Sequence, residues 1–103
     1  MKKVEYPIIP PVDVYETAGE VVVCIDLPGV AKSQVEVSVE GNVLEVCGRK
    51  LPGVREVRST FALLEREYGH FNLAIELPGR LEPRAARAEM EAGVLVIRIP
   101  RRQ

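Results

Sequence analysis

Few residues of this chain have the types and spacing that chemistry requires. His70 is the only histidine, in a Gly-His-Phe context, and without a partner nucleophile it supports no catalytic triad. Glu65 and Glu67, like Glu89 and Glu91, lie two residues apart, which on a strand places both carboxylates on one face. Such pairs are typical of a solvated sheet surface rather than of an acid–base pair in a cleft. We therefore expect no catalytic residue, no enzyme activity and no cofactor.

The two cysteines, Cys24 and Cys47, each lie inside an apolar, strand-like segment. We interpret them as buried or half-buried free thiols of a protein kept in a reducing cytosol. The alternative, a disulfide between them, requires Cα atoms within about 7 Å, and a sequence does not show that distance. Two cysteines and a single histidine are too few for a zinc site, so we expect no bound metal.

Composition and charge restrict the function further. The chain has 103 residues and a formal net charge of −1, with acidic and basic residues interspersed, which argues against a nucleic-acid-binding patch and against an acidic tail. Met1-Lys2-Lys3 runs directly into Glu5 and Pro7, without the apolar region of a signal peptide. No apolar run approaches the ~18 residues of a membrane span. These features predict a soluble, cytoplasmic protein with neither nucleic-acid nor membrane partners.

The elements that would position any site are strands. Aromatic residues make up 5% of the chain and tryptophan is absent, so the core must come from Val, Leu, Ile and Ala, which favours strands rich in β-branched residues. The only stretch that favours a helix is 81–86, and we expect a single turn there. Alternating apolar and polar residues predict strands over residues 12–16, 20–27, 35–40, 43–48, 71–77 and 88–99, the last being a hairpin, with a weak strand over 59–64.

Turn residues connect these strands into one fold. Gly41-Asn42 predicts a short hairpin. Ala92-Gly93 joins the two halves of the 88–99 hairpin, and because alanine disfavours positive φ, we expect a type II turn with positive φ only at Gly93. Regularly spaced strands without amphipathic helices predict an all-β fold, a two-sheet antiparallel immunoglobulin-like sandwich. We expect one domain over residues 12–101, preceded by an extended, Pro-punctuated lead-in over residues 1–11.

Five short motifs occur along the chain in a fixed order. They are Asp26-Leu27-Pro28-Gly29-Val30, Val43-Leu44-Glu45-Val46-Cys47-Gly48-Arg49, Glu65-Arg66-Glu67-Tyr68-Gly69-His70-Phe71, Leu77-Pro78-Gly79 and the Ala88 to Leu95 pattern A-x-x-x-x-G-V-L. In this order they resemble the alpha-crystallin domain of small heat shock proteins of bacterial and plant type, from about Val12 to Arg101. One departure is Leu73, which stands where the family usually has an arginine, so that arginine's ion pair at a dimer interface is not transferred to this chain.

The resemblance implies an ATP-independent molecular chaperone, a holdase that binds unfolding client proteins and prevents their aggregation. It also implies a client-binding groove between two strands whose apolar side chains face each other. The alternative is that the same side chains are ordinary core residues. The implied groove residues are Val35, Val37, Val39, Ala86, Ala88 and Met90.

The long segment 49–70 is the second functional candidate. Its length resembles that of the loop which, in bacterial and plant relatives, carries a strand exchanged with a partner subunit, so the resemblance implies a homodimer. The alternative is a strand that pairs within its own subunit. The implied interface residues are Thr60, Phe61, Ala62, Leu63, Leu64 and Arg66.

The two ends carry further expectations. Family members usually have a long N-terminal arm and a C-terminal tail with an I-x-[IV] motif, and Ile97-Arg98-Ile99 matches that motif but lies within the last strand, where we expect core residues. Residues 7–10 are either an apolar plug or a simple extended lead-in. From the short ends we expect reduced oligomerisation, to dimers or small oligomers. The alternative function is a co-chaperone or adaptor of the CS-domain type, which binds a folded partner.

Overall fold

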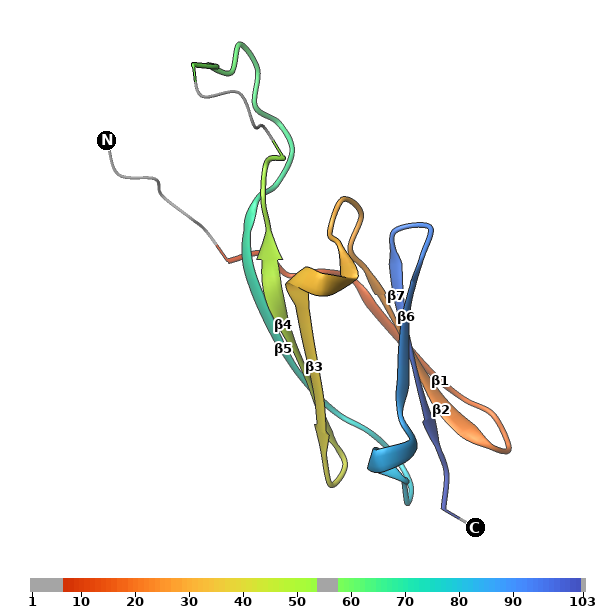
Figure 1. Ribbon diagram of the computed structural model, residues 1–103. Coiled ribbons are helices and arrows are strands. Elements are labelled where there is room, and N and C mark those ends of the chain that lie inside the picture. Colours follow the sequence, from red (N-terminus) through yellow and green to blue (C-terminus); the bar gives the residue numbers. More distant parts are fainter. Residues whose placement is uncertain (1–6, 54–57, 103) are drawn as a thin grey trace.

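The computed structural model describes residues 7–53 and 58–102 and confirms the predicted all-β fold. Two antiparallel sheets pack face to face as a sandwich that is open at its edges (Figure 1). The four-stranded sheet has the order β1 (Val12–Glu16), β2 (Glu20–Asp26), β7 (Val94–Pro100) and β6 (Arg87–Glu91). The three-stranded sheet has the order β3 (Val35–Glu40), β4 (Val43–Lys50) and β5 (Gly69–Glu76).

The inner faces of both sheets carry the apolar residues that the alternation predicted. β2 and β7 pair so that Val23 lies opposite Ile97, and both side chains are fully buried. The three-stranded sheet adds Leu44, Val46 and Phe71, each at most 1% exposed. The segment 97–99 is therefore part of a core strand, as expected from the sequence.

Gly48 marks the tightest contact of the three-stranded sheet. A Cβ atom at Gly48 would lie 2.8 Å from Cζ of Phe71 and would also overlap the carbonyl oxygen of Gln34. Phe71 lies opposite Gly48 in the β4–β5 register, and its ring fills the space that a side chain would need. Because the core has no room to move aside, only glycine fits this position.

The turn between β6 and β7 differs from the one predicted. Ala92 has a φ of 50° and Gly93 a φ of 79°, so both central residues have positive φ, as in a type I′ turn, and the expected type II turn is wrong. Glu91 pairs with Val94, which leaves a two-residue loop, and the twist of the strands favours a primed turn for that length. Leu27 N–H donates a hydrogen bond of 2.8 Å to the carbonyl of Gly93 and holds the turn in place.

The connections also differ in part from the expectations. β4 continues to Lys50 and β5 begins at Gly69, so both strands extend into the predicted 49–70 loop. The described residues 58–68 contain no strand, so a strand over 59–64 paired within its own chain is wrong. Polar residues flank this segment, and it does not pair with an edge strand of either sheet of its own chain. Residues 54–57 of the loop and residues 1–6 of the lead-in lie outside the described residues.

Two short 3-10 helices lie where the chain passes from one sheet to the other. η1 (Lys32–Gln34) precedes β3 and was not predicted, whereas η2 (Pro83–Ala85) is the single turn expected within 81–86. Along the described ranges, neither of these helices nor any other has the length and apolar character to cross a membrane.

Candidate binding surfaces

The predicted groove residues lie on two strands that end their sheets. β3 pairs only with β4 and β6 pairs only with β7, and Figure 1 shows both on the side of the sandwich nearer the viewer. Ala86 lies just before β6, where η2 ends. All six residues are partly buried and pack against the core: Val35, Val37, Val39, Ala86, Ala88 and Met90. The structure therefore places them at the rim of the core, along the edges of the two sheets.

The backbone of these two strands adds a second binding element. A strand that ends a sheet presents a row of N–H and C=O groups that its neighbour does not pair. On β3 and β6 the apolar side chains alternate with exposed polar ones, so the rim combines half-buried apolar groups with free backbone groups. Such an edge can add an extended segment of another chain, with backbone hydrogen bonds for affinity and apolar contacts from alternate side chains.

Two hollows lie on the outer faces of the sheets, away from the predicted groove residues. One, of about 290 Å³, surrounds Val96 on the four-stranded sheet, and the other, of about 540 Å³, includes Cys47 on the three-stranded sheet. Cys24 faces outward from the four-stranded sheet, so the two thiols lie on opposite outer faces. Both thiols are free and half-buried, as expected from the sequence, and the disulfide alternative is wrong.

Charged groups around the first hollow form a small network that the sequence did not predict. Glu20 Oε1 lies 3.0 Å from Nη1 of Arg98, and Glu20 Oε2 lies 3.6 Å from Nη2 of Arg87. The hydrogen bond to Glu20 raises the pKa of Arg98 above its ordinary value. These residues come from β2, β6 and β7. Glu20 is distant in sequence from the two arginines, and only the sheet register brings it beside them.

The candidates for chemistry remain separate in space. His70 is exposed on β5, and its backbone carbonyl, rather than its ring, accepts a hydrogen bond, from the N–H of Ile8. Within the described ranges, no group of three His, Cys, Asp or Glu residues is arranged to hold a metal ion.

The residues predicted for a dimer interface lie in the loop between β4 and β5. Figure 1 shows the described part of this loop reaching beyond the ends of the sheets. Phe61, Leu63 and Leu64 expose 51%, 73% and 57% of their surface, and Thr60 and Ala62 are exposed as well. Three large apolar side chains exposed within four residues are unusual on a soluble surface and indicate a contact with another molecule.

Arg66 is anchored within its own chain. Its guanidinium carbon lies 5.4 Å from the centre of the Tyr68 ring, a cation–π contact. The same guanidinium lies close to Gly29 in the connection after β2, because a Cβ there would be 3.3 Å from Nη2 of Arg66. The returning limb of the loop is therefore held at its base, while residues 60–64 extend from it.

β1 supplies a further exposed edge, in keeping with the short edge strand that the alternation over residues 12–16 predicts. This strand pairs only with β2, and its residues Val14 and Tyr15 expose 41% and 47% of their surface. The alternation in 12–16 predicts a strand but carries no signal for which of its sides stays unpaired.

Residues 7–11 cross from one sheet to the other. Ile8 N–H donates a hydrogen bond of 2.9 Å to the carbonyl of His70 on β5, and Pro11 accepts one of 3.1 Å from Asp26 on β2. Ile8 packs against the core, whereas Ile9 is 86% exposed. The described part of the lead-in thus has one apolar side chain inside and one outside. We call residues 7–11 the strap.

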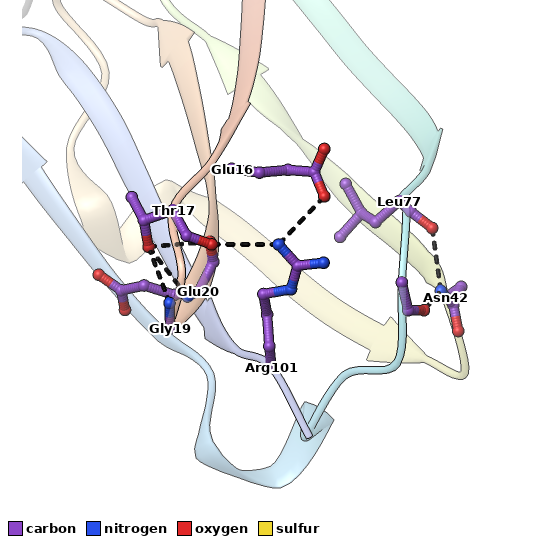
Figure 2. A network of polar contacts seen from close by, with 8 residues as sticks. Glu16, Thr17, Gly19, Glu20, Asn42, Leu77 and Arg101 are labelled. Atoms are coloured by element: carbon purple, nitrogen blue, oxygen red, sulfur yellow. Dashed lines mark hydrogen bonds and ion pairs between the residues drawn. The ribbon is translucent and has the colours of Figure 1, made fainter. Parts of the chain in front are cut away.

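A polar network closes the opposite end of the sandwich (Figure 2). The side-chain amide of Asn42 donates hydrogen bonds to the carbonyls of Leu77, at 2.9 Å, and of Gly79. Leu77 N–H in turn donates to the carbonyl of Asn42 at 2.7 Å. The β3–β4 turn is thereby fixed to the segment 77–86 that crosses from β5 to β6.

Arg101 joins the other sheet to the same end. Its Nη1 donates to the carbonyl of Thr17 at 3.1 Å and lies 3.3 Å from Oε1 of Glu16 (Figure 2). The turn between β1 and β2 is itself fixed by Thr17, whose hydroxyl accepts from Glu20 N–H at 3.0 Å. The end formed by these turns and by segment 77–86 is called the closed end below.

Comparisons with known proteins agree with this fold. The model of the Hsp20/alpha crystallin family matches residues 13–103. The small heat shock protein C2 of Rickettsia felis is 29% identical over 99 residues, which cover 96% of this chain and 64% of that protein. The 18.3 kDa class I heat shock protein of Oxybasis rubra is 37% identical over 93 residues, which cover 89% of this chain and 58% of that protein. This chain therefore spans less than two thirds of the length of these relatives.

Solved structures show the same sandwich. Heat shock protein 16.0 of Schizosaccharomyces pombe superposes with a TM-score of 0.84 at 26% identity, covering 91% of this chain and 87% of that chain. The hspA protein of Xanthomonas axonopodis gives a TM-score of 0.78 at 32% identity, covering 96% and 97%. Fold and comparisons together define an open β-sandwich of two antiparallel sheets with exposed strand edges. The chain belongs to the Hsp20/alpha crystallin family, as the motif order in the sequence indicated. The small heat shock proteins of this family are ATP-independent chaperones and not enzymes.

Proposed function

We propose that this protein is an ATP-independent holdase of the cytoplasm that binds apolar segments of unfolding proteins and keeps them from aggregating. The observation that carries the proposal is the rim formed by β3 and β6, where half-buried apolar side chains stand beside unpaired backbone groups. A rim of this kind recognises extended apolar chain with little dependence on sequence, which suits many clients. Binding of partly unfolded chains competes with their association and requires no chemistry.

We also propose that two copies form a homodimer by exchanging the loop between β4 and β5. Residues 60–64 would pair with β1 of the partner, because β3 and β6 form the client rim and the strap occupies the start of β5. Phe61 and Leu63 would lie on one face of the added strand, beside either Val14 or Tyr15, which point to opposite faces of β1, and all four side chains are exposed in the single chain. The exchange is reciprocal, so one two-fold axis relates both contacts.

The chaperone proposal is tested by adding the protein, without ATP, to an aggregating heat-labile enzyme and recording light scattering. The native protein should suppress scattering. Val37→Glu places a charge on the inner side of β3 and should reduce suppression at least about fivefold, because a client would have to desolvate that carboxylate.

Ser38→Glu is the matched control, since it adds the same charge to the same strand but on the exposed outer face. It should protect as the native protein does. Circular dichroism establishes that both variants keep the sandwich. A native protein that fails to suppress scattering at any ratio contradicts the proposal, as does equal protection by the two variants.

A further inference from the structure

An exposed patch on the outer face of the three-stranded sheet carries negative charge without compensation. Val43 is 39% exposed and lies between Glu40 on β3 and Glu76 on β5 in the sheet register. Glu45 follows two residues along β4 on the same face. Among the described residues, none of these three carboxylates has an ion-pair partner. We call Glu40, Val43, Glu45 and Glu76 the acidic patch.

Two arginines with equally uncompensated charge lie nearby, at the closed end. Arg80 and Arg84 are exposed in segment 77–86, and within the described part of the chain neither forms an ion pair. Arg80 follows Glu76 by only four residues, yet the two side chains do not meet. We call Arg80 and Arg84 the basic crossover.

The backbone beneath these arginines is held firmly. Arg102 N–H donates a hydrogen bond of 2.8 Å to the carbonyl of Arg80, and Glu82 N–H donates one of 2.8 Å to the carbonyl of Pro100. Asn42 binds the carbonyl of Gly79 just before Arg80. The backbone that carries the basic crossover is therefore fixed to the β3–β4 turn and to the last strand, so ordering the two arginines in a contact costs little backbone entropy.

We propose that the acidic patch of one copy binds the basic crossover of a second copy, and the reverse, in a two-fold contact at the closed end. Two adjacent patches of opposite charge form a self-complementary surface, and a two-fold axis lets each patch meet its counterpart. The axis passes between the two patches, so that Val43 of each copy packs against the aliphatic part of an arginine side chain in the partner's basic crossover. This site lies at the end opposite the β4–β5 loop and uses neither the client rim nor the exchanged segment, so it stands even if strand exchange fails.

The contact is tested by sedimentation velocity of the full chain over a range of protein and NaCl concentrations. Exposed ion pairs are individually weak and are screened by salt, so self-association should increase at low salt. Its dissociation constant should rise about tenfold between roughly 50 and 300 mM NaCl. The double variants Glu45→Lys with Glu76→Lys, and Arg80→Glu with Arg84→Glu, should each lose this association because both patches of a copy then carry the same sign.

Mixing the two double variants should restore association, since each lysine patch then meets a glutamate crossover and each arginine crossover meets an acidic patch. The control for the lysine variant is Glu89→Lys with Glu91→Lys, which makes the same change in net charge on the outer face of the other sheet and should associate like the native protein. All of these positions are exposed. If one double variant fails to fold, the other still tests the contact, because one changes the acidic patch and the other the basic crossover. The proposal is overturned if no part of the self-association weakens with salt, if the salt-dependent part is lost equally in the control, or if mixing the two double variants does not restore it.

Discussion

The lack of space for a Cβ atom at position 48 allows only glycine there. We predict that Gly48→Ala lowers the free energy of unfolding by about 1–3 kcal/mol, because the added methyl group overlaps Phe71 and the Gln34 carbonyl in a packed core. Gly19→Ala is the control, since no atom lies within 4 Å of a Cβ at that position. It should change stability by no more than about 0.5 kcal/mol. Urea denaturation of the three proteins measures the difference, and similar midpoints for both variants would show that the strands can separate at Gly48.

Ala92 shows that residue type alone does not determine the conformation of a turn. Alanine disfavours positive φ, so the sequence predicted a turn with positive φ only at Gly93. The structure gives Ala92 a φ of 50° because the register of β6 and β7 leaves two residues for the turn, and the hairpin compensates the local cost. Strand pairing is set by the whole apolar pattern of both strands, and it overrode the preference of one residue.

At the scale of elements, the alternation of apolar and polar residues predicted where the strands lie, but it did not predict which strands pair with each other. The segment 35–40 forms β3 with the expected faces, because burial of every second valine is a local property of the sequence. That β3 and β6 end their sheets is a property of topology, and it required the resemblance to a known family. The extension of β4 to Lys50 and of β5 to Gly69 was missed because polar side chains there hide a backbone pairing.

The loop between β4 and β5 is the element whose role is most open to test. We predict that Phe61→Asp with Leu63→Asp dissociates the proposed homodimer, because each aspartate would have to be desolvated against the partner's β1. Sedimentation should then show a monomer at moderate salt, and the circular dichroism spectrum should remain that of a β-sandwich, because both residues are exposed in the single chain.

Leu51→Asp provides the comparison for this loop. Leu51 is also apolar and 43% exposed, but it lies on the other limb, directly after β4 and outside the proposed exchanged segment. This variant should remain dimeric. A dimer that survives the double substitution would show that the exchanged segment does not hold the subunits together.

At the scale of the molecule, the sandwich has four strand edges and manages each differently. β3 and β6 form the proposed client rim, β1 is the proposed acceptor of the partner's loop, and the strap covers the start of β5. An uncovered edge invites unspecific pairing. The strap also links the two sheets, since its hydrogen bonds reach His70 on β5 and Asp26 on β2. Sequence reasoning could place these residues as extended but could not tell which isoleucine faces inward, since Pro10 and Pro11 leave no periodic pattern.

The strap therefore predicts a difference between two neighbouring isoleucines. Ile8→Ala should lower the free energy of unfolding by about 1 kcal/mol, because Ile8 packs against the core and loses apolar burial. Ile9→Ala removes the same atoms from a side chain that is 86% exposed, and it should change stability by less than about 0.3 kcal/mol. Denaturation in guanidinium chloride, followed by circular dichroism, gives both values. If the strap is not part of the folded unit in solution, the two variants will unfold at the same midpoint as the native chain, and the amide hydrogen of Ile8, which donates to His70, will exchange as quickly as in an unstructured peptide.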